Sequence, residues 1–295
     1  MFVQSKSFSF AMGTIFLVVL AGCAPKQLRV ATVALTLRDV AHATGKQPSP
    51  RVIREGTPAY LMLLEGLLEA EPQRRELLLA ACQAYVAYAS SIMPQDNPEE
   101  VGVLFLRARN FGFQALSVAL HTDFKAATTG TLEGFKTVLA KCGKKEVPDL
   151  FWTTSAWANW IALSISKVEA LADLPLLEAA MKRTLELDET YYFGGPHLIQ
   201  GVYLASKPAV LGGNLDQARA HFDRALQLGG DRNLTAKVYL AQYYARAAGD
   251  RELYRHSLEE VLAAPIEEGS PMTLSNVMAK EKAKWLLDKT EEYFD

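Results

Sequence analysis

Residues 218–226 decide the fold and read Ala218-Arg-Ala-His-Phe222-Asp-Arg-Ala225-Leu226. They place a small residue, an aromatic residue and another small residue on one face of a helix. A small residue lets the two helices of a hairpin approach closely, and a large residue one turn further on fills the groove between hairpins. The tight-turn pair Gly213-Asn214 comes shortly before this stretch. The spacing therefore predicts one helix of a hairpin that packs against neighbouring hairpins.

Weaker copies of this spacing lie on both sides of it. The corresponding positions are Leu177, Met181 and Thr184 upstream and Tyr254, Leu258 and Val261 downstream, and the first helices of the three hairpins are expected at 155–170, 196–206 and 235–247. Nearly every other segment after residue 27 has helical periodicity, and none has the sustained alternation of a strand. We therefore expect an all-α protein whose TPR-like helical hairpin repeats form an α-solenoid or superhelix of about 11–12 helices. The alternative is an irregular helical bundle.

The N-terminus has the pattern of a bacterial lipoprotein signal. A short polar start containing Lys6 precedes an apolar run from Phe8 to Ala21. This run is too short to cross a bilayer of about 30 Å as a helix, but it suits a signal peptide. It ends in Leu20-Ala21-Gly22-Cys23, which resembles a lipobox. An ordinary secretory signal with an incidental cysteine is the alternative.

The lipobox divides the chain into three parts. We expect a signal peptide at 1–22, a lipidated N-terminus and first helix or linker at 23–50, and the TPR-like helical domain at 51–295. The lipid on Cys23 would attach the protein to the membrane on the periplasmic side, stably if it carries two or more acyl chains. Ala24 follows in place of the Asp that retains many lipoproteins at the inner membrane, which favours the outer membrane over the inner.

Composition and motifs exclude several classes of function. The formal net charge is −2, so the chain lacks the surplus of basic residues that would indicate a nucleic-acid partner. The five histidines form no His-Glu-x-x-His motif, and Gly-x-Ser-x-Gly does not occur. Cys82 and Cys142 are either a disulfide of an exported protein or two small core residues. We expect no enzyme activity, no metal site and no cofactor besides the lipid on Cys23.

One block of the chain resembles a known family. The resemblance rests on Asp188-Glu-Thr-Tyr-Tyr-Phe-Gly-Gly-Pro-His197-Leu-Ile-Gln-Gly201-Val-Tyr203, on Lys207-Pro208-Ala-Val-Leu-Gly212-Gly213-Asn-Leu-Asp-Gln-Ala218-Arg-Ala-His-Phe222 and on Asn233-Leu-Thr-Ala-Lys237-Val-Tyr-Leu-Ala-Gln-Tyr-Tyr-Ala-Arg246. Looser similarity continues at 77–85, 152–160 and 274–279. On these residues the chain resembles the T component of TRAP transporters (TatT), a family of periplasmic lipoproteins.

The resemblance implies both an architecture and a role. The family has cryptic TPR-like hairpins and is associated with a TRAP-type periplasmic solute-binding protein. At least one member of the family resembles a homotrimer in its assembly and has an apolar-lined pore through each subunit. The resemblance therefore implies a homotrimer that passes a hydrophobic small ligand. No enzyme activity is attached to the family. The alternative is a general envelope scaffold lipoprotein that uses its hairpins for assembly or secretion.

Aromatic residues and nearby polar groups are the candidates for ligand or partner contacts. Aromatic side chains in helical repeats usually form the core, and the alternative is that some of them line the channel between the first helices. Trp152, Trp157 and Trp160 cannot all face the same way on one helix, so some of them must be structural. The long segment 206–213 either carries recognition or forms an apolar plug through Val210 and Leu211. The candidates are Trp152, Trp157, Asn159, Trp160, Tyr192, His197, Gln200, Tyr203, Lys237 and Tyr243.

Overall fold

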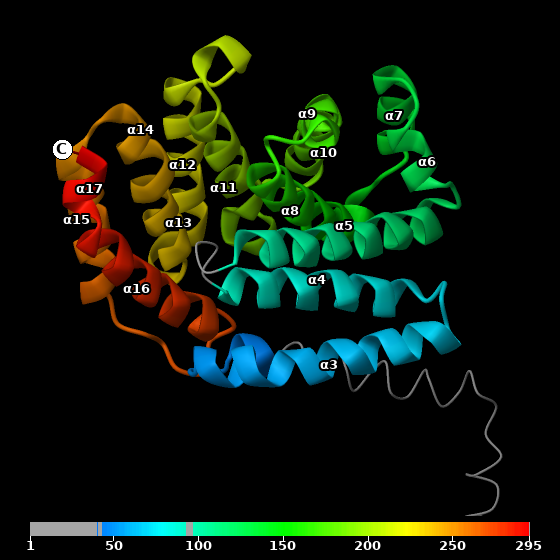
Figure 1. Ribbon diagram of the computed structural model, residues 1–295, viewed down its shortest axis with the longest axis horizontal. Helices are drawn as coiled ribbons and strands as arrows, with labels where there is room; N and C mark the ends of the chain where they lie inside the picture. The colour runs from blue at the N-terminus through cyan, green and yellow to red at the C-terminus, as the bar shows by residue number, and fades with distance from the viewer. Residues whose placement is uncertain (1–39, 41–42, 93–96, 295) are drawn as a thin grey trace, which may run out of the picture.

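The computed structural model describes residues 40, 43–92 and 97–294, so the expected signal peptide and Cys23 lie outside the described residues. The described residues form fifteen α-helical segments and no strand, which confirms the all-α prediction (Figure 1). The longer helices are α3 (Pro50–Ala70), α4 (Arg75–Ser91), α5 (Pro98–Leu120), α7 (Leu132–Leu139), α8 (Val147–Leu163), α10 (Leu174–Leu187), α11 (Tyr191–Ser206), α12 (Leu215–Gly229), α15 (Arg251–Ala263) and α16 (Thr273–Asp288). The shorter segments are α6 (Phe124–Thr128), η1 (Lys144–Glu146), α9 (Val168–Ala172), η2 (Ala209–Leu211), η3 (Gly230–Arg232), α13 (Leu234–Tyr239), η4 (Leu240–Ala245), α14 (Arg246–Ala248) and α17 (Thr290–Phe294).

Two long helical patterns are divided more finely than the sequence predicts. The helix expected at 155–170 is broken, because α8 ends at Leu163 and the short α9 begins only at Val168. The helix expected at 235–247 runs without a break through α13, η4 and α14, but η4 is a π-helical turn. Such divisions explain why the segments outnumber the about eleven or twelve expected helices. The TPR-like arrangement of the helices stays a prediction.

Several helix starts carry the side-chain caps that the sequence indicates. The Asn97 side chain accepts a hydrogen bond from the Glu100 amide at 3.2 Å, directly before Pro98. Asn214 caps α12 by accepting from the Gln217 amide at 2.9 Å. These caps satisfy backbone N–H groups that have no partner within the helix. The cap at Asn214 confirms the turn predicted before α12.

The hairpin of α11 and α12 contains the close contact that its sequence predicts. Ala218, Phe222 and Ala225 are fully buried. Gly201 of α11 lies so near the Phe222 ring that a Cβ there would be 3.1 Å from it. The missing side chain of Gly201 therefore lets the two helices approach, and Phe222 fills the space between them.

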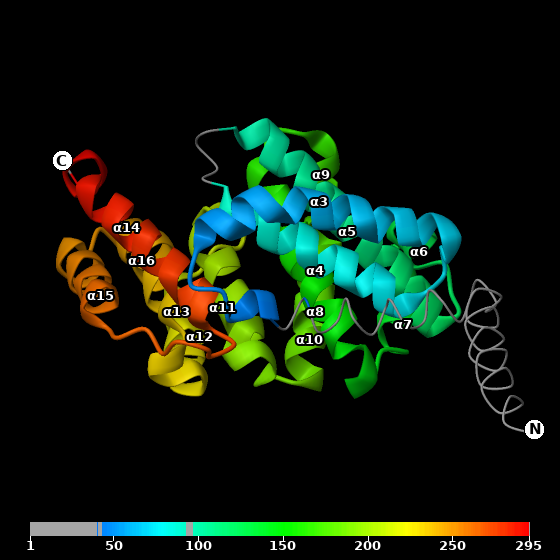
Figure 2. The same ribbon diagram turned by 90° about the horizontal axis from the view of Figure 1, so that it is seen from below.

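The helices pack into a closed circuit. Helix α3 packs on α4, α4 on α8, α8 on α11, α11 on η4, and α13 on α16, which returns to α3. Arg54 and Glu281 make an ion pair of 3.4 Å at this closure. At Gly45 a Cβ would be 2.7 Å from the carbonyl oxygen of Pro271. Figure 1 and Figure 2 both show α16 beside the start of α3, so the described chain forms a ring of helices.

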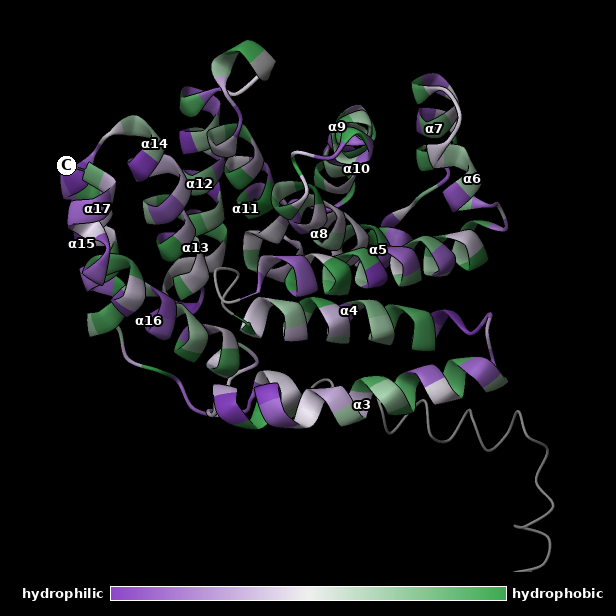
Figure 3. Cartoon of the chain, viewed as in Figure 1, coloured by the Kyte–Doolittle hydropathy of each residue, from purple (hydrophilic) through white to green (hydrophobic). Residues whose placement is uncertain are grey.

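Buried and exposed side chains answer two questions that the sequence leaves open. Cys82 and Cys142 are both buried and free, as expected of small core residues. Val210, at the tip of the loop between α11 and α12, is 92% exposed. The apolar-plug interpretation is therefore wrong for Val210, while the Leu211 side chain lies outside the described part. Figure 3 shows hydrophobic residues at this tip and along the length of α4.

Candidate functional site

Five aromatic side chains meet where α8 packs against the start of α11. We call Phe151, Trp152, Tyr191, Tyr192 and Phe193 the aromatic cluster. The ring centroids of Trp152 and Tyr192 are 4.9 Å apart, and those of Phe151 and Tyr191 are 5.1 Å apart. Both pairs meet edge to face, a geometry that stabilises aromatic contacts beyond simple burial. The cluster therefore joins two helices of the ring through specific ring contacts.

The backbone at the start of α11 is strained. Tyr192, Phe193 and Gly194 have φ values of 49°, 58° and 78°, in the left-handed region. This conformation costs roughly 1–2 kcal/mol for each residue other than glycine. The crowding is real, because a Cβ at Gly195 would lie 2.6 Å from the Phe151 ring. Strain of this kind concentrates at functional sites, where the surrounding structure imposes it.

The strained turn leaves the Tyr192 ring partly exposed. Its side chain is 42% exposed, which is unusual for an aromatic residue within a cluster. Burial nevertheless raises the pKa of the Tyr192 hydroxyl. Tyr192 is thus the member of the aromatic cluster that is available to a ligand.

A second group of side chains gathers around the π-helical turn η4. We call Tyr239, Gln242, Tyr243 and Lys282 the inner tyrosine face. The rings of Tyr239 and Tyr243 meet edge to face at 5.4 Å. The ammonium of Lys282, on α16, lies 5.0 Å from the centroid of the Tyr239 ring. Single π-helical turns of this kind are frequent at functional sites.

The neighbours of η4 show which way this face points. Lys237 pairs with Glu260 of α15 at 2.9 Å, and Arg219 of α12 lies over the Tyr244 ring at 5.5 Å. Tyr239 follows Lys237 by two residues and therefore projects from the opposite side of the helix. Because α11 and α16 flank the helix on its two remaining sides, the inner tyrosine face points into the ring.

The polar groups of this face are desolvated and lack partners. Burial raises the pKa of the Tyr239 and Tyr243 hydroxyls and lowers the pKa of Lys282 to about 8. The Oε1 atom of Gln242 is buried without a hydrogen-bond partner among the described residues. All four side chains are nevertheless only partly buried. The inner tyrosine face therefore combines aromatic rings with polar groups that remain partly accessible, the composition typical of a ligand site.

His197 has a different role, as a tie between helices. Its Nδ1 atom is 2.8 Å from Nδ1 of His221 on α12, and its Nε2 atom is 2.8 Å from Glu189. Arg224 also holds Glu189, and this hydrogen bond, followed by the one from His197, lowers the pKa of Glu189 to about 2. The partners of both ring nitrogens of His197 therefore come from the protein itself.

Four further candidates are engaged in internal contacts. Trp157 is fully buried and donates from Nε1 to Asp173 at 2.8 Å, and Trp160 is buried with Arg109 over its ring at 4.4 Å. The Tyr203 hydroxyl donates to Glu178 at 2.7 Å. Asn159 is exposed and donates to the Ser155 carbonyl at 2.8 Å. These contacts place the two tryptophans in the core, which is the structural role foreseen for some of the three.

The remaining candidates divide between the two groups and the helix interior. Trp152 and Tyr192 belong to the aromatic cluster, and Tyr243 belongs to the inner tyrosine face. Gln200 has a buried Oε1 atom without a partner in the described chain. Sequence reasoning chose Lys237 and missed Lys282. Lys282 lies in Lys280-Glu-Lys-Ala-Lys284, whose charges are typical of a solvated helix face, so nothing local distinguishes it.

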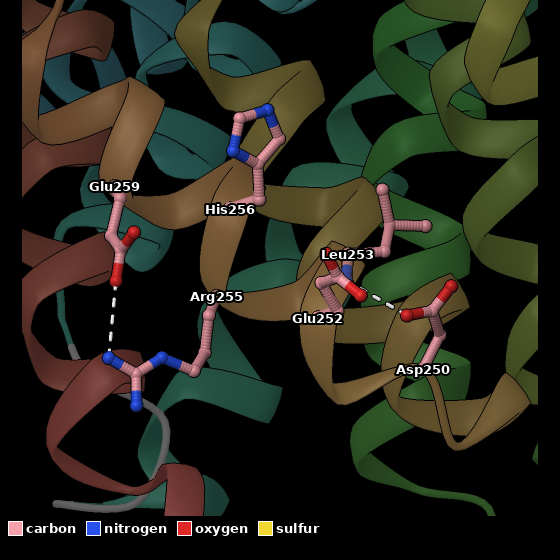
Figure 4. Close-up of a pocket in the computed structure, with 6 residues that line it drawn as sticks. All are labelled: Asp250, Glu252, Leu253, Arg255, His256 and Glu259. Atoms are coloured by element: carbon pink, nitrogen blue, oxygen red, sulfur yellow. Dashed lines mark hydrogen bonds and ion pairs between the residues drawn. The ribbon is translucent and has the colours of Figure 1, made fainter.

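A pocket on the outer surface does not add a ligand site. It has a volume of about 650 Å³ and is lined by Asp250, Glu252, Leu253, Arg255, His256 and Glu259 (Figure 4). Asp250 accepts a hydrogen bond from the Leu253 amide as the cap of α15, and Arg255 pairs with Glu259 at 3.3 Å. These polar groups therefore cap and stabilise α15 itself.

The family model of the TRAP transporter T-component matches residues 46–294. The chain belongs to this family. It is also similar to an uncharacterized protein of Treponema pallidum (strain Nichols), with 20% identity over 93% of this chain and 94% of the relative.

Membership has direct consequences for function. It implies association with a TRAP transporter, a place in the cell envelope and a non-enzymatic role in transport. Within the described residues, no helix combines the length and the hydrophobicity needed to span a bilayer.

The strain at the start of α11 leads to a paired prediction. Gly194→Ala forces a side chain into the left-handed region, with its Cβ 3.0 Å from Leu228, and we expect it to lower the free energy of unfolding by about 2 kcal/mol. Gly66→Ala, on an open face of α3, is the control and should raise that free energy by about 0.5–1 kcal/mol. Urea unfolding of both variants measures the difference. Equal effects at the two glycines would show that the turn is unstrained.

The desolvated Lys282 leads to a pH-dependent prediction. At pH 7 its charge is retained at a cost in the folded state, so Lys282→Met should raise the free energy of unfolding by about 1 kcal/mol. Above pH 8 the unfolded state binds more protons at this site than the folded state. The wild type should therefore gain stability with pH, and the advantage of the variant should shrink between pH 7 and 9. Lys284→Met, at an exposed position of the same helix, should change stability by less than about 0.5 kcal/mol at every pH.

Proposed function

We propose that this protein docks a TRAP-type solute-binding protein in the periplasm and passes a hydrophobic small ligand through its ring of helices. The observation that carries the proposal is the inner tyrosine face, because its half-buried aromatic side chains and unpaired polar ends point into the ring. Family membership supports the transport context. An apolar wall with a few polar groups is the usual composition of a small-molecule site.

Two features support passage rather than simple storage of a ligand. The aromatic cluster abuts the start of α13, where Asn233 donates to the Phe193 carbonyl at 3.4 Å and Arg232 lies over the Phe193 ring at 5.2 Å. The inner tyrosine face begins further along the same helix, at Tyr239. Aromatic surface available to an apolar molecule therefore extends along one wall of the ring.

Exposed apolar side chains support docking of a protein partner. Val210 is 92% exposed and Val168, on α9, is 77% exposed. Figure 1 shows the loop between α11 and α12 and α9 toward the same edge of the ring. Exposed apolar residues that cluster on one side of a protein mark interaction sites. We therefore propose this edge as the docking side.

We propose further that a lipid on Cys23 anchors the protein to the membrane, with the outer membrane favoured. The support is the lipobox Leu20-Ala21-Gly22-Cys23. In this case the protein produced in its bacterial host should partition with detergent, and mass spectrometry of the mature N-terminal peptide should find an acylated Cys23. Cys23→Ala should release the protein into the soluble fraction. A soluble wild type with an unmodified Cys23 would contradict the anchor.

Docking can be tested with the solute-binding protein of the same bacterium's TRAP system. We expect the two purified proteins to form a complex at micromolar concentrations in isothermal titration calorimetry. Val210→Asp should weaken this complex about tenfold or more, because a carboxylate would be buried in the interface. Val52→Asp on α3, away from the proposed docking side, is the matched control and should leave affinity unchanged. No complex between the folded proteins would count against docking, and equal effects of the two variants would count against this edge.

A further inference from the structure

The Lys282 ammonium has no anionic partner in the described chain. Among the described residues its ammonium contacts the Tyr239 ring, 5.0 Å from the ring centroid. The nearest carboxylate in sequence, Glu281, is turned to α3 and pairs with Arg54. The other lysines of the helix differ, because Lys280 donates to the Leu262 carbonyl and Lys284 is exposed. Lys282 is thus a partly buried cation for which the protein supplies an aromatic ring and no counter-ion.

The groups around Lys282 are also incomplete. The Gln242 Oε1 atom is buried and accepts no hydrogen bond within the described residues. Burial raises the pKa of the Tyr239 and Tyr243 hydroxyls, and the two rings meet edge to face. Leaving a buried polar group unpaired costs free energy that a ligand recovers when it supplies the partner. A charged donor, a buried acceptor and two aromatic rings therefore share one face that points into the ring.

We infer that Lys282 binds the carboxylate of an amphipathic ligand whose apolar body lies on the rings of Tyr239 and Tyr243. This inference rests on the proposed passage of an apolar ligand and adds the charge that the ligand carries. The lysine side chain only donates hydrogen bonds, so the group that it binds must be an acceptor. A cation is excluded by repulsion from the ammonium.

The number of charges favours a carboxylate over a phosphate. A phosphate ester carries nearly two negative charges and is usually held by arginine forks or by several cations. Lys282 is a single ammonium, and Lys237 of the neighbouring helix points away and is neutralised by Glu260. One ammonium balances one carboxylate. The ring contact with Tyr239 keeps the ammonium in place when no ligand is bound.

The test compares three probes of equal chain length: decanoate, decanol and decyltrimethylammonium. Binding to the full mature protein is measured by titration calorimetry at pH 7. We expect the wild type to bind decanoate about tenfold more tightly than decanol, and decyltrimethylammonium more weakly than both. Lys282→Met should bind decanoate and decanol equally. Lys282→Arg should keep the preference for decanoate, and Lys284→Met, at an exposed position of the same helix, should bind all three probes as the wild type does.

The outcomes separate this inference from the proposed function. Equal binding of decanoate and decanol by the wild type would overturn the carboxylate site and leave passage of apolar ligands in place. A preference for decanoate that survives in Lys282→Met would also overturn it, since another group would then hold the carboxylate. No binding of any probe by the folded protein would overturn passage of an apolar ligand and this inference with it.

Discussion

The structure depends on the close packing of neighbouring helices, most clearly of α11 against α12. Gly201 admits the Phe222 ring, and Ala218 and Ala225 hold α12 close on either side of it. Each helix buries its apolar side against its neighbours, from α3 on α4 to α13 on α16. Because α16 also contacts α3, the described chain closes into a ring.

Closure gives the two faces of each inner helix different chemistry. On the outer face of α13 and η4, Lys237 pairs with Glu260 of α15, and Arg219 of α12 lies over the Tyr244 ring. Tyr239, Gln242 and Tyr243 face the inside and leave polar groups unpaired. The strained turn at Tyr192 lies on the adjoining wall. Strain and unpaired polar groups both cost stability, and their occurrence on the inner side is expected when function maintains them.

The sequence indicates the residue types of the candidate site but not the partners of its side chains. The aromatic segments 151–160 and 191–193 were recognisable, but only burial separates Trp157, which lies in the core, from Tyr192, which is exposed. Lys237 was chosen because it lies beside aromatic residues in the sequence, and it pairs with Glu260 instead. Lys282 was missed because its aromatic neighbour comes from a helix far away along the chain. The sequence leaves the burial of Val210 open for the same reason, because only contacts with distant segments decide whether an apolar loop side chain is buried or exposed.

The sequence by itself determined the all-α class, the residue spacing around Phe222, the turn at Gly213-Asn214, and the resemblance to the T component of TRAP transporters. These depend on local periodicity and on residues close together in the chain, which a single sequence displays directly. Tertiary structure alone decided that α16 closes onto α3, that the chain turns left-handed at Tyr192, and that Lys282 meets Tyr239. Those features arise from contacts between distant segments, whose free energy depends on how whole helices pack and not on any one stretch of residues.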